Sequence, residues 1–309
     1  MRAWVLPLVW GCNYAPPSTD PVDSPAPTPD AAPTQFTLFV ADSGEGKVHR
    51  FAIEDSANIP APNLEIAVNG ALTPVILPQL DELLVGQVPN AVLVRFTTPF
   101  AQPTSNGLVS GGGLGANMGK MTMVDDELWV VNQAGSNVVR FAFDPDGVPS
   151  PAGAIPNIAM GRGIYFDAQR RNLYVSQCCG VNSVLHFGVS AERVVSSKST
   201  TSGVALSSPH GLLVTPWGEL FVANASANAI RRFMLTGGGQ PIPAGEITGN
   251  GLDLPFDLVM TPWDELFVTN GAGGTISRFT FDAAHVATPR DNFEVPDAAS
   301  LAWMALDVR

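Results

Sequence analysis

A five-residue pattern recurs six times along this chain, and it constrains the fold more than any other feature. The pattern is a leucine, an aromatic or aliphatic residue, valine or its equivalent, one variable residue and a polar residue. Its leading leucines are 45 to 47 residues apart, and a basic residue followed by phenylalanine comes 12 or 13 residues after each of them. The leucines are Leu38, Leu83, Leu128, Leu173, Leu220 and Leu266. Self-similarity at such a period is typical of a chain built from one repeated supersecondary unit.

Each repeat contains the material for a small antiparallel sheet. A short loop rich in Gly, Ser, Asn and Ala separates the leucine pattern from the basic residue and phenylalanine, which predicts a hairpin. Another apolar strand precedes the leucine, most clearly in the near-identical segments 209–219 and 255–265. A weaker fourth strand follows, for example at 64–68 or 292–295. Four short strands in about 45 residues predict one propeller blade, so residues 36–309 are predicted to form an all-β, six-bladed β-propeller.

The two ends of this region complement each other. The first repeat lacks its innermost strand, and the chain finishes with an unpaired copy of that strand at 300–306. We expect this C-terminal strand to lie inside the blade formed by residues 36–68. Such an arrangement closes the ring and leaves no open sheet edge.

The region before the repeats indicates export. Residues 1–12 contain a positive Arg2, an apolar run and Cys12, a pattern similar to a bacterial lipoprotein signal in which the cysteine is lipidated. Residues 13–35 are rich in Pro, Ala, Thr and Asp and cannot bury a core, so they are predicted to be an extended tether. The alternative for residues 1–12 is a secretory signal that is simply cleaved. Both alternatives place the propeller outside the cytoplasm. It is expected to be lipid-anchored in the bacterial cell envelope, or else periplasmic or extracellular.

Composition narrows the range of partners. With 16 Lys and Arg against 28 Asp and Glu, the net charge is −12, which repels nucleic acid and anionic lipid headgroups. No internal stretch reaches the roughly 18 apolar residues of a spanning helix, so membrane contact is expected only through lipidated Cys12. A monomer is expected.

The recurring motifs resemble those of NHL repeats and of the gluconolactonase-like and strictosidine-synthase-like six-bladed propellers. The resemblance spans residues 36–309 and rests on P-x-G before an apolar strand, then the leucine pattern, then the basic residue and Phe. These families include binders, scaffolds, lyases and lactonases, so the resemblance implies a fold and does not select a function.

Two sets of residues are expected to converge on one face, around the mouth of the central channel. The first set starts each innermost strand: Thr73, Met118, Arg162, His210, Phe256 and Ala299. The second set ends each leucine strand: Asp42, Gln87, Asn132, Gln177, Asn224 and Asn270. From these sets and the neighbouring Asp257, the candidate binding residues are Arg162, His210, Asp257, Asn132, Asn224 and Asn270. The alternative for the Asp and Asn side chains is structural, because such residues at strand ends cap the following turn.

The related families imply metal sites that this chain matches only in part. Similar lyases hold zinc with histidines from several blades, whereas only His210 is at such a position here, and a catalytic zinc needs three protein ligands. Similar gluconolactonases hold a divalent cation with a Glu, Asn and Asp set, to which Asp257 and the three asparagines bear a loose likeness. No cofactor is therefore expected, the alternative being one divalent cation such as calcium.

The basic residues that precede phenylalanine are expected to be structural. A cation in every blade is explained by a stem packed across the sheet and an ion pair with a turn carboxylate such as Glu219, Glu265 or Asp126.

Cys178 and Cys179 lie in a predicted hairpin on the same face. Adjacent α-carbons are about 3.8 Å apart, which is below the usual disulfide range. The two cysteines could form a vicinal disulfide or remain two free thiols.

Taken together, the sequence features lead to the hypothesis that the protein is a binding or scaffolding module for a protein or glycan. The alternative is a metal-dependent lactonase or lyase that uses Asp257, Asn224, Asn270 and His210, and no catalytic residue is assigned.

Overall fold

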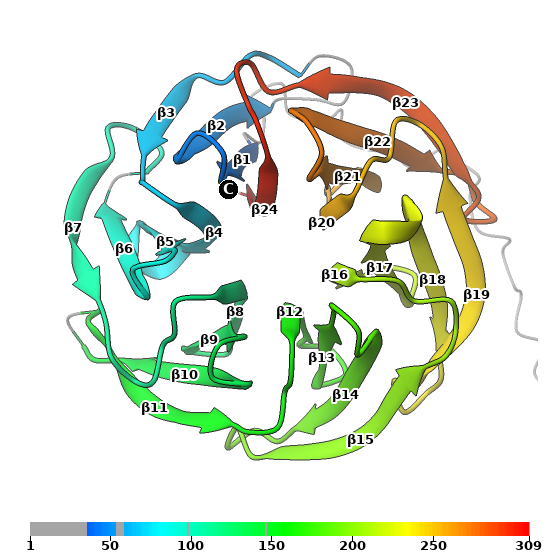
Figure 1. Ribbon diagram of the computed structural model, residues 1–309, viewed down its shortest axis with the longest axis horizontal. Helices are drawn as coiled ribbons and strands as arrows, with labels where there is room; N and C mark the ends of the chain where they lie inside the picture. The colour runs from blue at the N-terminus through cyan, green and yellow to red at the C-terminus, as the bar shows by residue number, and fades with distance from the viewer. Residues whose placement is uncertain (1–35, 54–58, 98, 146, 309) are drawn as a thin grey trace, which may run out of the picture. The chain divides into compact units, whose positions relative to one another are not determined.

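The computed structural model describes residues 36–53, 59–97, 99–145 and 147–308. These residues form 24 β-strands in six four-stranded antiparallel sheets, arranged radially around a central axis (Figure 1). The predicted six-bladed β-propeller is therefore confirmed.

Each blade contributes one strand to each of four concentric layers. The innermost strands are β4 (Ala71–Leu77), β8 (Met118–Val124), β12 (Gly161–Asp167), β16 (Pro209–Val214), β20 (Pro255–Met260) and β24 (Leu301–Val308). The second strands, which carry the leucine pattern, are β1 (Phe36–Asp42), β5 (Glu82–Gln87), β9 (Glu127–Asn132), β13 (Asn172–Gln177), β17 (Glu219–Asn224) and β21 (Glu265–Asn270). The third strands are β2 (Lys47–Ile53), β6 (Val92–Thr97), β10 (Asn137–Phe143), β14 (Ser183–Val189), β18 (Ala229–Leu235) and β22 (Thr275–Phe281). The outer strands are β3 (Leu64–Ala67), β7 (Thr104–Val109), β11 (Pro149–Ile155), β15 (Val195–Ser202), β19 (Pro241–Thr248) and β23 (Ala287–Glu294). Two short 3₁₀ helices, η1 (Pro78–Leu80) and η2 (Ala225–Ala227), follow β4 and β17.

The apolar run in each second strand follows from burial on both faces. One hydrophobic cluster fills each of the six gaps between neighbouring blades. Along β17, Leu220 and Val222 face the cluster toward β13, whereas Phe221 and Ala223 face the cluster toward β21. A strand buried on both sides needs apolar side chains at consecutive positions, so the pattern has no polar alternation.

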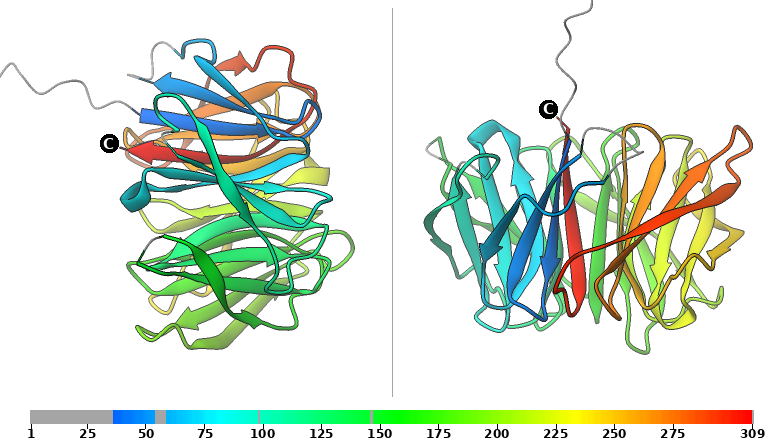
Figure 2. Two further views of the ribbon diagram at one scale, coloured as in Figure 1. Left: turned by 90° about the vertical axis from the view of Figure 1, so that its left-hand side faces the viewer. Right: turned by 90° about the horizontal axis from the view of Figure 1, so that it is seen from above.

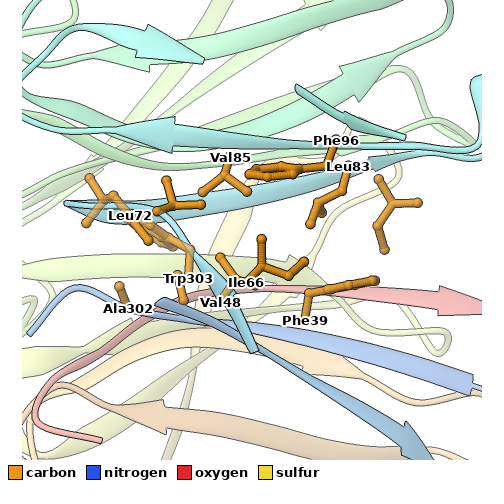
Figure 3. Packing of buried hydrophobic residues seen from close by; sticks show 13 residues of the cluster. Phe39, Val48, Ile66, Leu72, Leu83, Val85, Phe96, Ala302 and Trp303 are labelled. Atoms are coloured by element: carbon orange, nitrogen blue, oxygen red, sulfur yellow. The ribbon is translucent and has the colours of Figure 1, made fainter. Parts of the chain in front are cut away.

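The C-terminal strand closes the ring in the predicted place. β24 pairs with β1 in antiparallel register, with Phe39 opposite Ala305 and Val40 opposite Met304. Figure 2 shows the two strands running side by side across the thickness of the ring. Trp303 is fully buried between this blade and the next, beside Leu72 (Figure 3). The last strand therefore supplies part of the core as well as the missing edge.

The repeated basic residues have the structural role expected of them. In four blades an arginine of the third strand binds the glutamate that begins the second strand: Arg95–Glu82, Arg140–Glu127, Arg232–Glu219 and Arg278–Glu265. The expectation for Glu219 and Glu265 is confirmed. That for Asp126 is wrong, because Arg140 binds the next residue, Glu127, while Asp126 binds Arg193.

The predicted signal (1–12), the tether (13–35) and Cys12 lie outside the described residues. In the part of the chain that is described, no helix is long and apolar enough to cross a membrane.

Candidate functional site

The two ends of the central channel differ in the strand ends that surround them. At one end, here called the mouth face, innermost strands begin and second strands finish, as the pairs Pro209–Asn224 and Pro255–Asn270 show. At the other end, the floor face, innermost strands finish. The two predicted residue sets therefore do share one face.

A β-bulge near the mouth face interrupts all six innermost strands. In β16, for example, Pro209 pairs with Asn224 and Leu212 with Val222, so that His210 and Gly211 together oppose Ala223. Bulges re-aim side chains and are frequent beside functional sites. Each bulge places two consecutive residues of the innermost strand opposite one residue of the second strand, and we call them the first and second bulge positions.

The bulges correct the predicted strand-start set in three blades. The first bulge positions, in chain order, are Leu72, Gly119, Arg162, His210, Phe256 and Ala302. Arg162, His210 and Phe256 were placed correctly, whereas Thr73, Met118 and Ala299 were out of register. The repeats of Arg162, His210 and Phe256 have Gly-x-Gly, Pro-x-Gly and Pro-x-Asp at the position, and the other three repeats have none of these.

The second bulge positions contain an ion pair that crosses the channel. Lys120 Nζ lies 2.6 Å from Asp257 Oδ1 and 2.9 Å from Oδ2, and the N–H of Met304 donates to Oδ2 at 2.8 Å. Burial raises the pKa of the Asp257 carboxyl, while the Lys120 charge and these hydrogen bonds oppose the rise. A Cβ on Gly211 would collide with Asp257 Oδ1, so the neighbouring blade needs glycine there. Both carboxylate oxygens are thus engaged by the protein.

Arg162 lies on the mouth side of this ion pair and forms no ion pair with the described residues. Its side chain is mostly buried, and its Nε is fully buried without a hydrogen-bond partner among the described residues. No carboxylate of the described chain lies within ion-pair distance of its guanidinium. Burial lowers the pKa of Arg162. The group remains charged nevertheless, because an arginine side chain does not lose its proton in proteins.

His210 lies beside Arg162 on the next blade. The His210 ring is 8% exposed, and its Nδ1 lies 2.8 Å from the carbonyl oxygen of Ser208. Burial, and then the charge of Arg162, lower the pKa of His210 to about 4 against the opposing effect of the Ser208 bond. The ring of Phe256 on the following blade is 4.6 Å away, centroid to centroid. Near neutral pH His210 is therefore a neutral imidazole packed against an aromatic wall.

The three predicted asparagines are not brought together. Asn132, Asn224 and Asn270 lie in separate blades and are fully buried. Each Oδ1 accepts a backbone N–H from the loop that leads into the innermost strand of its own blade: Gly115 at 2.9 Å, Ser207 at 2.5 Å and Asp253 at 3.0 Å. Asp42 does the same for Ser300 and Ala299. This is the capping arrangement that the sequence left open as an alternative.

The residues present do not fit a divalent cation. Asp257 has both oxygens engaged, and the asparagine oxygens point to backbone N–H groups in different blades. Within the described ranges, no three His, Cys, Asp or Glu side chains come together in a metal-binding group. Catalytic zinc sites use three protein ligands, and calcium takes six to eight oxygens.

Cys178 and Cys179 are joined by a vicinal disulfide in the β13–β14 hairpin, on the mouth face. Cys178 is fully buried and Cys179 is exposed. The Nε2 of Gln133 donates to Cys178 Sγ at 3.8 Å, and the N–H of Cys178 donates to the carbonyl oxygen of Met160 at 2.9 Å. The bridge therefore borders the loop that leads to Arg162 in the same blade.

A chamber of about 430 Å³ occupies the channel between Lys120 and the floor face. All six innermost strands line it, mainly with aliphatic side chains and with four methionines. Lys120 is at its inner end and Asp307 at its rim. The ion pair thus separates an apolar chamber from the mouth that holds Arg162 and His210.

Lys120 is the site residue that sequence reasoning missed. Its repeat has Met118-Gly119-Lys120 where other repeats have P-x-G or P-x-D, so no motif marks it. The available signal was the pairing of Met118 with the strand-ending Asn132, which is equivalent to that of Pro209 with Asn224. Counting two residues onward from Met118 puts Lys120 in register with Asp257.

The fold defines this chain as a six-bladed β-propeller, and several solved structures are similar to it. A Bacteroides fragilis protein to which 6-phosphogluconolactonase activity has been ascribed superposes with a TM-score of 0.71 at 12% identity, covering 91% of this chain and 100% of its own. The periplasmic gluconolactonase of Pseudomonas aeruginosa gives 0.66 at 12% identity, covering 88% and 99%. A chain of the nidogen/laminin complex gives 0.67 at 14% identity, covering 88% and 98%. In sequence, the chain matches no family profile and no curated protein. These likenesses establish the fold alone.

Proposed function

We propose that this protein is an exported binding module, anchored through Cys12, whose propeller binds a protein or glycan ligand on the mouth face. The observation that carries the proposal is the engagement of Asp257 by Lys120 and by the Met304 N–H. Asp257 then has no free oxygen with which to hold a cation or to act as a general base. What the mouth face offers instead is a buried cation, two partly buried rings and the disulfide hairpin.

The alternative is a metal-dependent lactonase or lyase. It draws support from the names of two structural neighbours, both only 12% identical to this chain. The nidogen/laminin neighbour, at 14% identity, belongs to a complex of binding partners, so the fold serves both kinds of protein. The ligand set that the alternative requires from Asp257, His210 and two asparagines is dispersed here. For that reason we favour binding.

The test uses the purified full chain, dialysed and analysed for metals by inductively coupled plasma mass spectrometry. In parallel, glucono-δ-lactone hydrolysis is followed by pH indicator, and a glycan array and envelope-protein pull-down are probed. We expect no stoichiometric divalent metal, no lactone turnover above the uncatalysed rate, and a captured glycan or protein. A stoichiometric metal together with turnover that Asp257→Asn abolishes would establish the alternative.

A further inference from the structure

We propose that the mouth of the channel binds the carboxylate of a hydroxy acid between Arg162 and His210. Arg162 holds the carboxylate, and His210 accepts a hydrogen bond from a neighbouring hydroxyl. This inference rests on the proposed binding at the mouth face and names the ligand class for it. It covers a free sugar acid as well as an acidic sugar at the end of a glycan, since both present the same groups.

Arg162 supplies the charge that such a ligand would complement. Among the described bulge positions, the charged residues are Lys120, Arg162 and Asp257, and Lys120 already neutralises Asp257. One positive charge is left over inside a protein whose net charge is −12. Arg162 is mostly buried and its Nε is fully buried without a hydrogen-bond partner among the described residues, and holding such an ion out of water is costly. A bound carboxylate would remove that cost, because guanidinium and carboxylate form parallel, charge-assisted hydrogen bonds.

Comparison with the other arginines shows that Arg162 is exceptional. Every other described arginine that is even partly buried makes a side-chain hydrogen bond or ion pair, as Arg95 does with Glu82 and Arg50 with Asn63. Arg290, which has no ion pair within the described ranges, is exposed to solvent. The third-strand arginines Arg95, Arg140, Arg232 and Arg278 have their carboxylates within the same sheet. Arg162 instead occupies a bulge position on an innermost strand, where its own blade offers it no carboxylate.

The tautomer of His210 specifies the second group of the ligand. The Ser208 carbonyl oxygen can only accept, so Nδ1 of His210 carries the proton that is donated to it. With the His210 pKa lowered to about 4, the ring is neutral near pH 7 and Nε2 has a free lone pair. The hydrogen bonds of His210 to the described residues involve Nδ1 and not Nε2. Nε2 therefore accepts a hydrogen bond, and a ligand hydroxyl can donate one.

These two groups select among anions. A phosphodiester presents only acceptor oxygens, with which the lone pair of Nε2 can form no hydrogen bond. A carboxylate with a hydroxyl on a nearby carbon presents an acceptor to Arg162 and a donor to His210. The ring of Phe256, 4.6 Å from His210, provides an apolar wall for the carbon skeleton. A hydroxy acid of the sugar-acid class can bind Arg162 through its carboxylate, donate a hydroxyl hydrogen bond to His210 and pack its carbon skeleton against Phe256.

The experiment is isothermal titration of the full chain with three matched probes at pH 7. D-Gluconate carries a carboxylate and hydroxyls, acetate carries only the carboxylate, and D-glucitol carries only the hydroxyls. A glucuronate-terminated oligosaccharide is the fourth probe and distinguishes a glycan end from a free acid. We expect gluconate or the oligosaccharide to bind at least about tenfold more tightly than acetate or glucitol, because acetate lacks the hydroxyl for His210 and glucitol lacks the carboxylate for Arg162.

Variants then identify the groups responsible. Arg162→Met should abolish the preference for the acid, His210→Phe should bring gluconate down to the level of acetate, and Arg290→Met should change nothing. Arg162→Met should also keep or raise the melting temperature, because it removes an unpaired buried charge. Equal binding of glucitol and gluconate, or unchanged affinity in Arg162→Met, would overturn the inference. If no acid binds while the array captures a neutral glycan or a protein, the hydroxy-acid inference fails and the proposed binding function stands.

Discussion

Lys120 and Asp257 belong to blades on opposite sides of the ring, and their ion pair joins those blades across the central channel, with Lys120 Nζ 2.6 Å from Asp257 Oδ1. The Lys120 side chain is 12% exposed and that of Asp257 is fully buried. The N–H of Met304, which lies in the closing blade, donates a hydrogen bond to the same carboxylate. Three blades are thereby connected at one point, in addition to the hydrophobic clusters that join each blade to its neighbours.

The first prediction concerns this ion pair. Asp257→Asn or Lys120→Met alone should lower the free energy of unfolding by about 3–5 kcal/mol, because each leaves a buried charge without its partner. The double variant should recover much of that loss, since it removes both charges. Urea denaturation of the three variants measures this as a double-mutant cycle. Glu246→Gln, which breaks the more exposed pair with Arg231, is the control and should have little effect. Additive losses in the cycle would contradict the assignment.

The second prediction concerns ring closure. Trp303 is fully buried between the closing blade and its neighbour, and truncation of such a side chain leaves a large cavity. Trp303→Ala should cost about 3–5 kcal/mol of stability, and Trp303→Phe should cost less because a ring still fills part of the space. Thermal unfolding followed by circular dichroism measures both. Equal stability of the alanine variant and the wild type would show that the last strand contributes little to the core.

The fold was predictable because each of the six repeats contains the strand pattern of one blade. Six copies of one pattern gave six independent indications of the same blade, and the orphan strand at 300–306 showed how the ring closes. Details that occur once were harder to predict. Asp126 was predicted to be one of the turn carboxylates that pair with the repeated basic residues, whereas the neighbouring Glu127 binds Arg140.

The third prediction concerns acid sensitivity at His210. Its pKa is about 4 in the folded protein and near 6.5 in an unfolded chain, so between these values the unfolded state binds more protons and stability rises with pH. On acidification from pH 7 to pH 5, His210 should contribute a loss of roughly 2 kcal/mol. His210→Gln should reduce the observed loss by that amount. Chemical denaturation at both pH values gives the comparison.

His186 provides a check on this prediction. Burial and the nearby charge of Lys198 lower the pKa of His186 to about 4 as well, so it adds a second loss in the same direction. His186→Gln combined with His210→Gln should flatten the pH dependence further than either change alone. If His210→Gln left the loss between pH 7 and pH 5 unchanged, His210 would not be the neutral, buried imidazole described here.

The candidate site was predicted less completely than the fold, for a physical reason. Arg162 and His210 were found because their repeats keep the bulge motif in register, and Asp257 because its repeat closely copies the preceding one. The pairing of Asp257 with Lys120 joins residues 137 apart in the chain, on opposite blades. A repeat pattern reports what each blade shares with the others, whereas a contact across the axis depends on what distinguishes one blade from another.

The fourth prediction concerns the anchor. If Cys12 is lipidated, the wild-type protein should incorporate labelled palmitate and fractionate with membranes, and Cys12→Ser should do neither. Metabolic labelling in a bacterial host, followed by fractionation, measures both properties. Because the cysteines of the propeller are bridged, Cys178→Ser is a control that should leave the labelling unchanged. Labelling that persists in Cys12→Ser would place the lipid elsewhere.

The last prediction concerns the vicinal bridge between Cys178 and Cys179. A bond between adjacent residues closes almost no loop, so it removes little entropy from the unfolded chain, and reduction should change the melting temperature only slightly. Its effect should be local, at the hairpin that borders the loop leading to Arg162. Thiol titration of the Cys12→Ser protein should find none before reduction and two after it. Hydrogen exchange should then increase around residues 177–183 while the remaining blades stay protected. Two titratable thiols in unreduced, denatured protein purified under air would instead show that the cysteines are free.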